Sequence, residues 1–263
     1  MSIKEAMQVR KSVRKYEKIN VNEDLINQVK KDLDEYTNVI YDTKIRFVVL
    51  RDMDQAKNTK LGFLWGLGKI DAPCCIVGIY EDKAKGMAEI GFALEREVLK
   101  ITEAGYGSCW LGTFNEKTFS QICNCTGKER VGIVVVFGAA KESGFMNTNF
   151  RKIAGSTKRK DISEICLNQI DATLDEKVID MIKYSILAPS AVNFQPVRIG
   201  IDGNRADFYL ASDSMVDVGI FMSHFYLCLK ELSHNVQVIV EEPKQKCYTV
   251  KDGMTYIASI RYE

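Results

Sequence analysis

The chain has 263 residues, of which 46% are hydrophobic and 27% charged, a composition that supports a folded core and excludes a disordered protein. Its 36 basic and 35 acidic side chains give a net charge of +1, so we expect no nucleic-acid partner held by a general basic field. The longest apolar stretch, residues 132–140, is far too short to span a bilayer, and we expect no membrane association.

The eight cysteines show no regular framework of the kind found in small secreted proteins, and a chain of this length folds without disulfides. Cys123 and Cys125 have metal-like spacing, but the two histidines, His224 and His234, lie far away in the sequence. The first 18 residues lack the apolar core of a signal peptide. We therefore expect reduced thiols, no metal site and a cytoplasmic location.

The first half of the chain contains a mixture of helix and strand patterns. Apolar residues at helical spacing predict helices over residues 2–10, 22–36 and 86–104, and Asn22 is a suitable N-cap for the second helix. Runs of β-branched and aromatic residues predict strands over residues 44–50, 73–80 and 131–137. The last two runs are continuously apolar, which is typical of strands covered on both faces. The pattern predicts an α+β fold with helices packed on a sheet.

The second half repeats this plan. Residues 89–92, which we expect to open the long helix, match residues 217–220 at an offset of 128, and residues 45–47 resemble residues 197–199 at an offset of 152. Chance similarity between amphipathic helices is the alternative, but order, type and several identities agree, so we favour an internal duplication. The two predicted units are a first half, residues 1–165, and a shorter second half, residues 166–263.

The second copy starts with a predicted helix at residues 176–187 and contains a long helix from Asp217. We expect an apolar stripe of this long helix to pack against the first half, so that the tail is no dispensable domain. The stripe consists of Val218, Met222, Phe225, Leu229 and Leu232.

Two basic clusters are candidate anion sites. Arg10, Ser12 and Arg14 alternate, and in extended chain such residues project to the same side. Two guanidiniums and a hydroxyl on one side suit a phosphate, although the segment by itself also fits a solvated basic loop. A second cluster, residues 158–160, precedes a predicted helix cap at Asp161, and by itself it fits an ordinary surface loop.

Two loops carry further candidate residues. Residues 105–112 follow the long helix, with Gly105 at a C-cap position and further glycines that permit close approach to a flat ligand. An ordinary helix-to-strand loop is the alternative, and the spacing is not that of a Rossmann motif. Residues 188–196 contain two prolines that restrict the backbone, and Ser190, Asn193 and Gln195 present polar groups from this rigid loop.

In combination these motifs resemble the nitroreductase family. They are Arg-x-Ser-x-Arg at residue 10, Gly-x-Gly-x-Cys-Trp-Leu-Gly at residue 105, Lys-Arg-Lys at residue 158, and Ala-Pro-Ser-x-x-Asn-x-Gln-Pro at residue 188. The resemblance implies a nitroreductase-like α+β fold, with helices packed around a mainly antiparallel sheet, and non-covalent FMN that normally lies at a homodimer interface. The FMN contacts that it implies fall on Arg10, Ser12, Arg14, Trp110, Leu111, Gly112, Lys158, Arg159, Pro189, Ser190 and Asn193.

The chain departs from the usual family pattern in one informative way. The Pro-Ser-x-x-Asn loop usually follows the second helix, but residues 36–42 lack it and the loop follows the equivalent helix of the second copy. That copy lacks Arg-x-Ser-x-Arg, and its counterpart of the Gly-rich loop is residues 232–235. Each half carries what the other lacks, which resembles a pseudo-dimeric branch that needs no obligate partner chain. Val197 replaces a Trp that often follows Gln-Pro, which leaves the packing behind the loop open.

The resemblance implies a reaction that passes electrons from NADH or NADPH through FMN to a small acceptor such as a nitroaromatic or quinone. It identifies no side chain as an obligatory acid or base. Two alternatives remain at this point. One is another FMN reaction on this fold, such as reductive dehalogenation or flavin fragmentation, with residues 51–70 and 141–157 as candidate lids. The other is a flavin-binding module without turnover.

Overall fold

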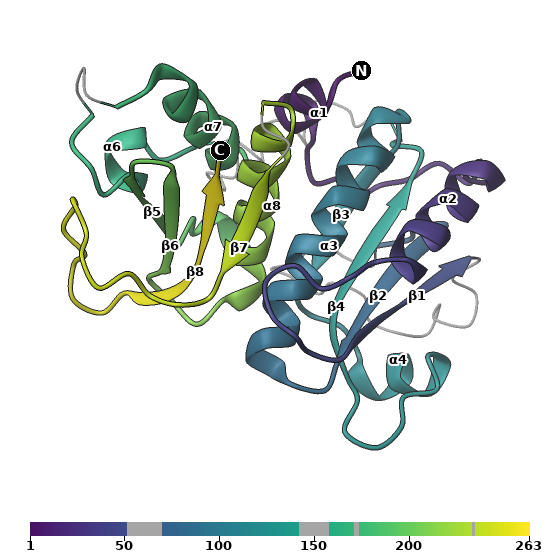
Figure 1. Cartoon of the computed structure of the whole chain (residues 1–263). Coiled ribbons are helices and arrows are strands. Elements are labelled where there is room, and N and C mark those ends of the chain that lie inside the picture. The colour runs from purple at the N-terminus through teal and green to yellow at the C-terminus, as the bar shows by residue number, and fades with distance from the viewer. Residues whose placement is uncertain (52–69, 142–157, 171–173, 233–234) are drawn as a thin grey trace.

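The computed structural model describes residues 1–51, 70–141, 158–170, 174–232 and 235–263. Two long helices, α3 (Lys83–Glu103) and α8 (Met215–Lys230), lie side by side at the centre, with one four-stranded sheet on either side (Figure 1). None of the helices in these ranges is long and apolar enough to cross a membrane. The candidate lid segments lie almost wholly outside the described residues.

The first sheet has the order β1-β2-β4-β3, and all its neighbouring strands are antiparallel. Side chains of β2 alternate between two cores: Cys74 and Ile76 face α2 and α3, whereas Cys75 and Val77 face α4. Both faces are therefore covered, as the continuous apolar run predicts. The elements are α1 (Ile3–Val9), α2 (Glu23–Asp34), β1 (Ile45–Arg51), β2 (Cys74–Tyr80), β3 (Gly107–Leu111), α4 (Glu116–Ile122) and β4 (Arg130–Gly138).

The second sheet has the order β5-β6-β8-β7, which is the order of the first sheet with equivalent strands in equivalent places. Its long helix also comes between the second and third strands of the copy, as the predicted duplication requires. Residues 52–73 join β1 to β2, whereas residues 203–204 join β5 to β6, and this accounts for most of the shortening. The elements are α6 (Ile162–Ile165), α7 (Glu176–Ile186), β5 (Val197–Asp202), β6 (Arg205–Leu210), β7 (Val236–Ile239) and β8 (Thr255–Tyr262).

Helix α3 differs from its predicted boundaries at the start. Asp82 is its N-cap and accepts a hydrogen bond from Lys85 N, so the helix begins at Lys83 and Glu89 lies inside it. The expectation that Glu89 opens the helix is wrong, because the capping carboxylate of Asp82 lies about two turns earlier. The predicted N-cap Asn22 of α2 is confirmed, since its side chain accepts from Asp24 N and Leu25 N.

The segment after α3 is only partly a loop. Gly105 has a φ of +84°, and Tyr106 N donates to Ile101 O, so the predicted glycine C-cap is confirmed as a Schellman motif. Residues Gly107–Leu111, however, form β3 and pair with β4, with Trp110 opposite Val135. The loop prediction for these five positions is wrong, because ladder bonds to β4 satisfy their backbone groups.

The two long helices cross at a pair of glycines. A Cβ on Gly91 would lie 2.3 Å from Val216 O, and a Cβ on Gly219 would lie 2.0 Å from Ala88 O. Gly91 and Gly219 are 128 residues apart, and so are Ala88 and Val216, so each contact is the equivalent of the other. The helix pair therefore has local two-fold pseudo-symmetry. The predicted stripe of α8 is buried, except for Leu232, which lies beyond the helix end and is 53% exposed. Its inclusion in the stripe was wrong, because the helical spacing ends at Lys230.

Candidate functional site

The segment after α1 runs along the edge of β3. Val13 N donates to Ser108 O at 2.8 Å, and Ser12 forms a parallel bridge with the same residue. Val13 is buried in the core that β2 shares with α4. Because side chains alternate along extended chain, Ser12 and Arg14 lie on the other side, where both are half-buried.

Arg10 ends α1 and turns its guanidinium into the protein. Its Nε and Nη1 atoms are buried and have no hydrogen-bond partner among the described residues. Burial lowers the pKa of Arg10, while the nearby Glu95 carboxylate favours the charged form. A buried guanidinium with two unused donors is costly unless an anion completes it, so the position fits a phosphate group.

The second basic cluster meets the proline-containing loop. Arg159 donates from Nη1 to Asn193 Oδ1 and from Nη2 to Leu187 O, the latter at 3.0 Å. Asn193 Nδ2 in turn donates to Lys158 O at 2.8 Å. Burial lowers the pKa of Arg159, and the charge of Arg10 lowers it further. The structure therefore brings together one residue from each of three separate motifs.

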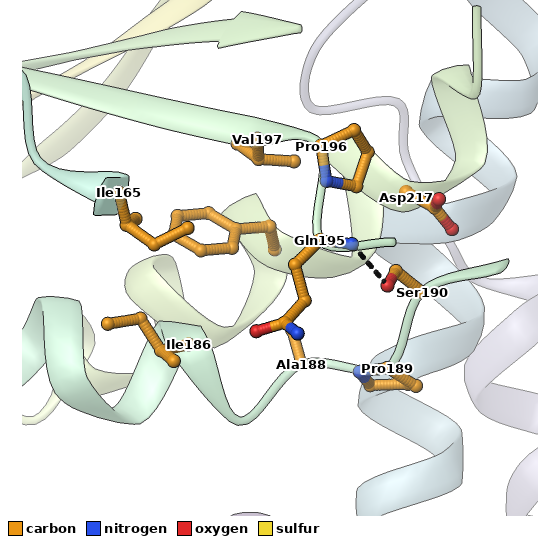
Figure 2. A pocket seen from close by; sticks show the side chains of 10 residues that line it. Ile165, Ile186, Ala188, Pro189, Ser190, Gln195, Pro196, Val197 and Asp217 are labelled. Carbon is orange, nitrogen blue, oxygen red and sulfur yellow. Dashed lines mark hydrogen bonds between the residues drawn. The ribbon is translucent and has the colours of Figure 1, made fainter. Parts of the chain in front are cut away.

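The loop at 188–196 has an unusual backbone. Val192, Asn193 and Gln195 have φ values of 46°, 56° and 52°, a left-handed conformation that is unfavourable for a β-branched valine. Gln195 N donates to Ser190 Oγ at 2.9 Å, which closes the loop on itself (Figure 2). These internal bonds and the proline-restricted backbone make a rigid loop, as the sequence predicts.

Equivalent carboxylates of the two long helices hold equivalent loops. Asp217 accepts from Ala191 N at 3.1 Å, and burial raises the pKa of Asp217 to about 6. Glu89, 128 residues earlier, accepts from the backbone N–H groups of residues 39–41 and from Tyr36 Oη, the last at 2.6 Å. The loop at 36–42 is thus held in the place where a second Pro-Ser-x-x-Asn loop would lie.

The three predicted ligand-contact residues of the Gly-rich segment, Trp110, Leu111 and Gly112, do not all face the same side of the sheet. Trp110 is half-buried, and its Nε1 donates to Glu95 Oε2 at 3.1 Å. Leu111 points to the opposite face and is 5% exposed, so only its backbone could reach a ligand. Gly112 is exposed, and a Cβ added there would meet nothing within 4 Å. The strand end therefore offers accessible backbone, which suits the close approach of a flat molecule.

Comparison with known proteins identifies the family. The family model described as "putative TM nitroreductase" matches residues 2–229. The chain belongs to this nitroreductase family. Family membership supports a general oxidoreductase role. A search of curated proteins found no match.

One solved structure supports the fold over the whole chain, and two others are similar over about half of it. A "putative nitroreductase" from Thermotoga maritima MSB8 is 22% identical and has a TM-score of 0.65, with 100% of this chain and 93% of that chain covered. A nitroreductase family protein from Clostridium novyi NT is 21% identical (TM-score 0.47; 54% and 87% covered). A protein from Clostridium difficile R20291 named FMN-dependent nitroreductase is also 21% identical (TM-score 0.41; 56% and 95% covered). The first of these matches extends over both halves of the nitroreductase described here.

Val197, which stands where the family often has Trp, packs tightly in this nitroreductase. Its side chain is 2% exposed at the start of β5. A small pocket beside it is lined by Ile165, Ile186, Pro189 and Asp217 among others (Figure 2). Ile165 of α6, Ile186 of α7 and Phe221 of α8 line the space behind the loop, so an aromatic ring from another helix lies there although position 197 carries no Trp.

Two residues near the candidate site could not be identified from the sequence. Glu95 and His224 are completely buried, and His224 Nε2 lies 2.9 Å from Glu95 Oε1. The pair joins α3 to α8, and Glu95 also contacts Trp110. The available signal was a histidine among mostly apolar neighbours in α8, whereas Glu95 does not stand out because Arg96 and Glu97 follow it in the same helix. Within the described ranges no three His, Cys, Asp or Glu side chains gather as a metal site.

Proposed function

We propose that this nitroreductase is an FMN-dependent oxidoreductase that passes electrons from NADH or NADPH to a small acceptor such as a nitroaromatic or a quinone. The observation that carries the proposal is the buried, unpartnered guanidinium of Arg10, close to the Arg159–Asn193 pair. FMN supplies the redox chemistry when bound, and the chain supplies binding, orientation and exclusion of water.

The proposed binding roles follow the three parts of the site. Arg10, Ser12 and Arg14 would hold the phosphate together with Lys158 and Arg159, since guanidinium and ammonium groups form charge-assisted hydrogen bonds with phosphate oxygens. The backbone at the end of β3 would lie along the flavin ring, beside the Trp110 indole. The second half would close the site with Pro189, Ser190 and Asn193.

The division of motifs supports one FMN per chain. The pseudo-symmetric position has the loop at 36–42, bound to Glu89, and the second copy has no Arg-x-Ser-x-Arg. A dianionic phosphate there would lack the two arginines and the serine of the first motif, which is unfavourable. Because both parts of the complete site belong to one chain, the site needs no partner chain, and we propose none. We also propose a cytoplasmic setting, since none of the eight cysteines forms a disulfide.

An absorption spectrum of the purified protein tests the proposal directly. We expect flavin absorption bands in the blue part of the visible spectrum. They should disappear when NADH or NADPH is added in the absence of oxygen, and they should return when a nitroaromatic or a quinone is then added. A colourless protein that also fails to take up added FMN contradicts flavin binding. If the protein holds flavin but neither NADH nor NADPH bleaches it, the proposed reaction is contradicted, and the protein is a flavin-binding module without this turnover.

Flavin content measured together with molecular mass in solution tests the stoichiometry. We expect one flavin per chain at any oligomeric state. Two flavins per chain would contradict the division of motifs. A mixture of Asn193→Ala and Arg10→Ala chains provides a second test, because each variant damages one side of the site. Recovery of FMN affinity on mixing would show that the site is shared between chains.

A further inference from the structure

Glu95 connects groups from both halves of the chain. Its Oε2 accepts from Trp110 Nε1 at 3.1 Å, and its Oε1 lies 2.9 Å from His224 Nε2. The other ring nitrogen of His224, Nδ1, lies 3.1 Å from the Tyr184 carbonyl oxygen. Both ring nitrogens of His224 therefore face oxygen atoms, one from a carboxylate and one from a backbone carbonyl.

The guanidinium of Arg10 lies near the same Glu95 carboxylate. Arg10 is half-buried with its Nε and Nη1 atoms fully buried, and the nearby Glu95 carboxylate favours the charged form of its guanidinium. Glu95 is completely buried, and burial of a carboxylate is costly unless cations and donors surround it. Arg10, His224 and the Trp110 N–H together meet this requirement. The carboxylate thus links the phosphate-facing arginine to the indole at the end of β3.

The pseudo-symmetric position lacks this arrangement. An offset of 128 residues relates Glu95 to Ser223 and His224 to Arg96. Ser223 Oγ and Arg96 Nε are buried atoms without a hydrogen-bond partner among the described residues. Helices α3 and α8 therefore pack around the pseudo-axis without a carboxylate–imidazole pair on that side. Among the described residues of α3 and α8, the pair occurs on the side near Arg10 and not at the equivalent position, which favours a role at the site over a role in packing.

We infer that Glu95 is a positioning residue of the ligand site, which orients the Trp110 indole through a hydrogen bond and balances the charge of the nearby Arg10 guanidinium, whose buried Nε and Nη1 remain available to a ligand phosphate. The identity of the ligand as FMN rests on the proposed function, whereas the contacts of Glu95 do not. His224, on a helix of the second half, contacts this carboxylate and so fixes its position relative to that half. The arrangement keeps the phosphate end and the ring end of the site in register.

Fluorescence of the ligand-free protein tests the contact with Trp110. Trp65→Phe leaves Trp110 as the single tryptophan, and Glu95→Ala in this background removes the acceptor of its indole N–H. We expect a shifted emission maximum and increased quenching by acrylamide. Glu95→Gln retains an acceptor oxygen and should restore the parent emission. Glu97→Gln is the matched control, because Glu97 is a buried carboxylate of the same helix that bonds to Lys100.

Titration with FMN tests the link to Arg10. We expect Glu95→Ala to raise the Kd for FMN at least tenfold and Glu95→Gln at least threefold, while Glu97→Gln changes it less than twofold. In an Arg10→Met background either Glu95 substitution should change the Kd by a smaller factor than in the parent, because part of the effect of Glu95 acts through the same phosphate contact. If Glu95→Ala does not fold, the same comparison of Kd values with Glu95→Gln, in the parent and in the Arg10→Met background, tests the link between Glu95 and Arg10.

Three results would overturn the inference: unchanged Trp110 emission in Glu95→Ala, an equal effect of Glu97→Gln, or full additivity of the Glu95 and Arg10 substitutions. If the parent protein binds no FMN at all, the proposed function fails. The emission of ligand-free protein still tests the Glu95–Trp110 contact in that case.

Discussion

The crossing of α3 and α8 makes the most direct prediction about stability. Gly219→Ala would place a Cβ 2.0 Å from Ala88 O and 2.8 Å from Phe92 N, whereas ordinary contacts are 3.4–4 Å. Both neighbours are backbone atoms, so no rotamer change relieves the clash and the helices must separate by roughly 1 Å. Such overpacking costs about 3 kcal/mol, and the preference of Ala over Gly inside a helix returns about 1 kcal/mol.

The expected net loss is therefore about 2 kcal/mol in the free energy of unfolding, or a Tm lower by roughly 4–8 °C for a chain of this size. Thermal unfolding followed by circular dichroism measures it. Gly112→Ala is the matched control for stability, since a Cβ there meets nothing within 4 Å, and its Tm should stay close to that of the parent. A Gly219→Ala protein as stable as the parent would refute the close crossing and with it the packing of the two halves.

Four further predictions concern the site and the two halves. Arg10→Ala or Arg14→Ala should each weaken FMN binding by about 1.5–3 kcal/mol in calorimetric titrations, and riboflavin, which has no phosphate, should lose less; equal losses would exclude a phosphate contact. Val192→Gly should raise the free energy of unfolding in urea by about 1 kcal/mol, because the valine is 78% exposed and has a φ of 46°; no gain would argue against the left-handed loop. Burial raises the pKa of Asp217 to about 6, above its ordinary 3.8, so its contribution to stability is complete below pH 4 and lost as the pH rises through 6; Asp217→Asn should therefore gain stability relative to the parent between pH 4 and pH 7, and a constant difference would contradict the shift. A chain that ends near residue 165 should aggregate or dimerise on a sizing column, because the apolar face of α3 loses its cover; a soluble, monomeric, FMN-replete fragment would refute the pseudo-dimer.

Much of the fold could be predicted because the pattern of each element is local. Hydrophobic periodicity located the long helices and the buried strands to within a few residues, and Asn22 and Gly105 marked a helix start and a helix end. The errors lie where a local pattern has two solutions. Gly107–Leu111 reads as a glycine-rich loop, and only pairing with β4 makes it a strand.

The candidate site was predicted as separate motifs and not as an arrangement. Motif resemblance identified Arg10, Arg159 and Asn193, but the contact between Arg159 and Asn193 depends on chain segments that meet only after folding. Glu95 and His224 were missed for the same reason. A buried carboxylate and a histidine on different helices have no sequence spacing that connects them, because the crossing of α3 and α8 brings them together.

The sequence by itself determined the elements, the duplication and the types of residue that suit an anion, because periodicity, capping and side-chain chemistry are properties of short segments. The sequence also showed how the motifs divide between the two halves, and only the tertiary structure decided which side chains meet at each of the two equivalent positions. On one side two buried guanidinium atoms of Arg10 have no hydrogen-bond partner among the described residues, near the Glu95–His224 pair, and on the other Glu89 binds the loop at 36–42. Burial and long-range pairing set this difference, since the cost of an unpaired buried charge exists only once the two halves have packed together.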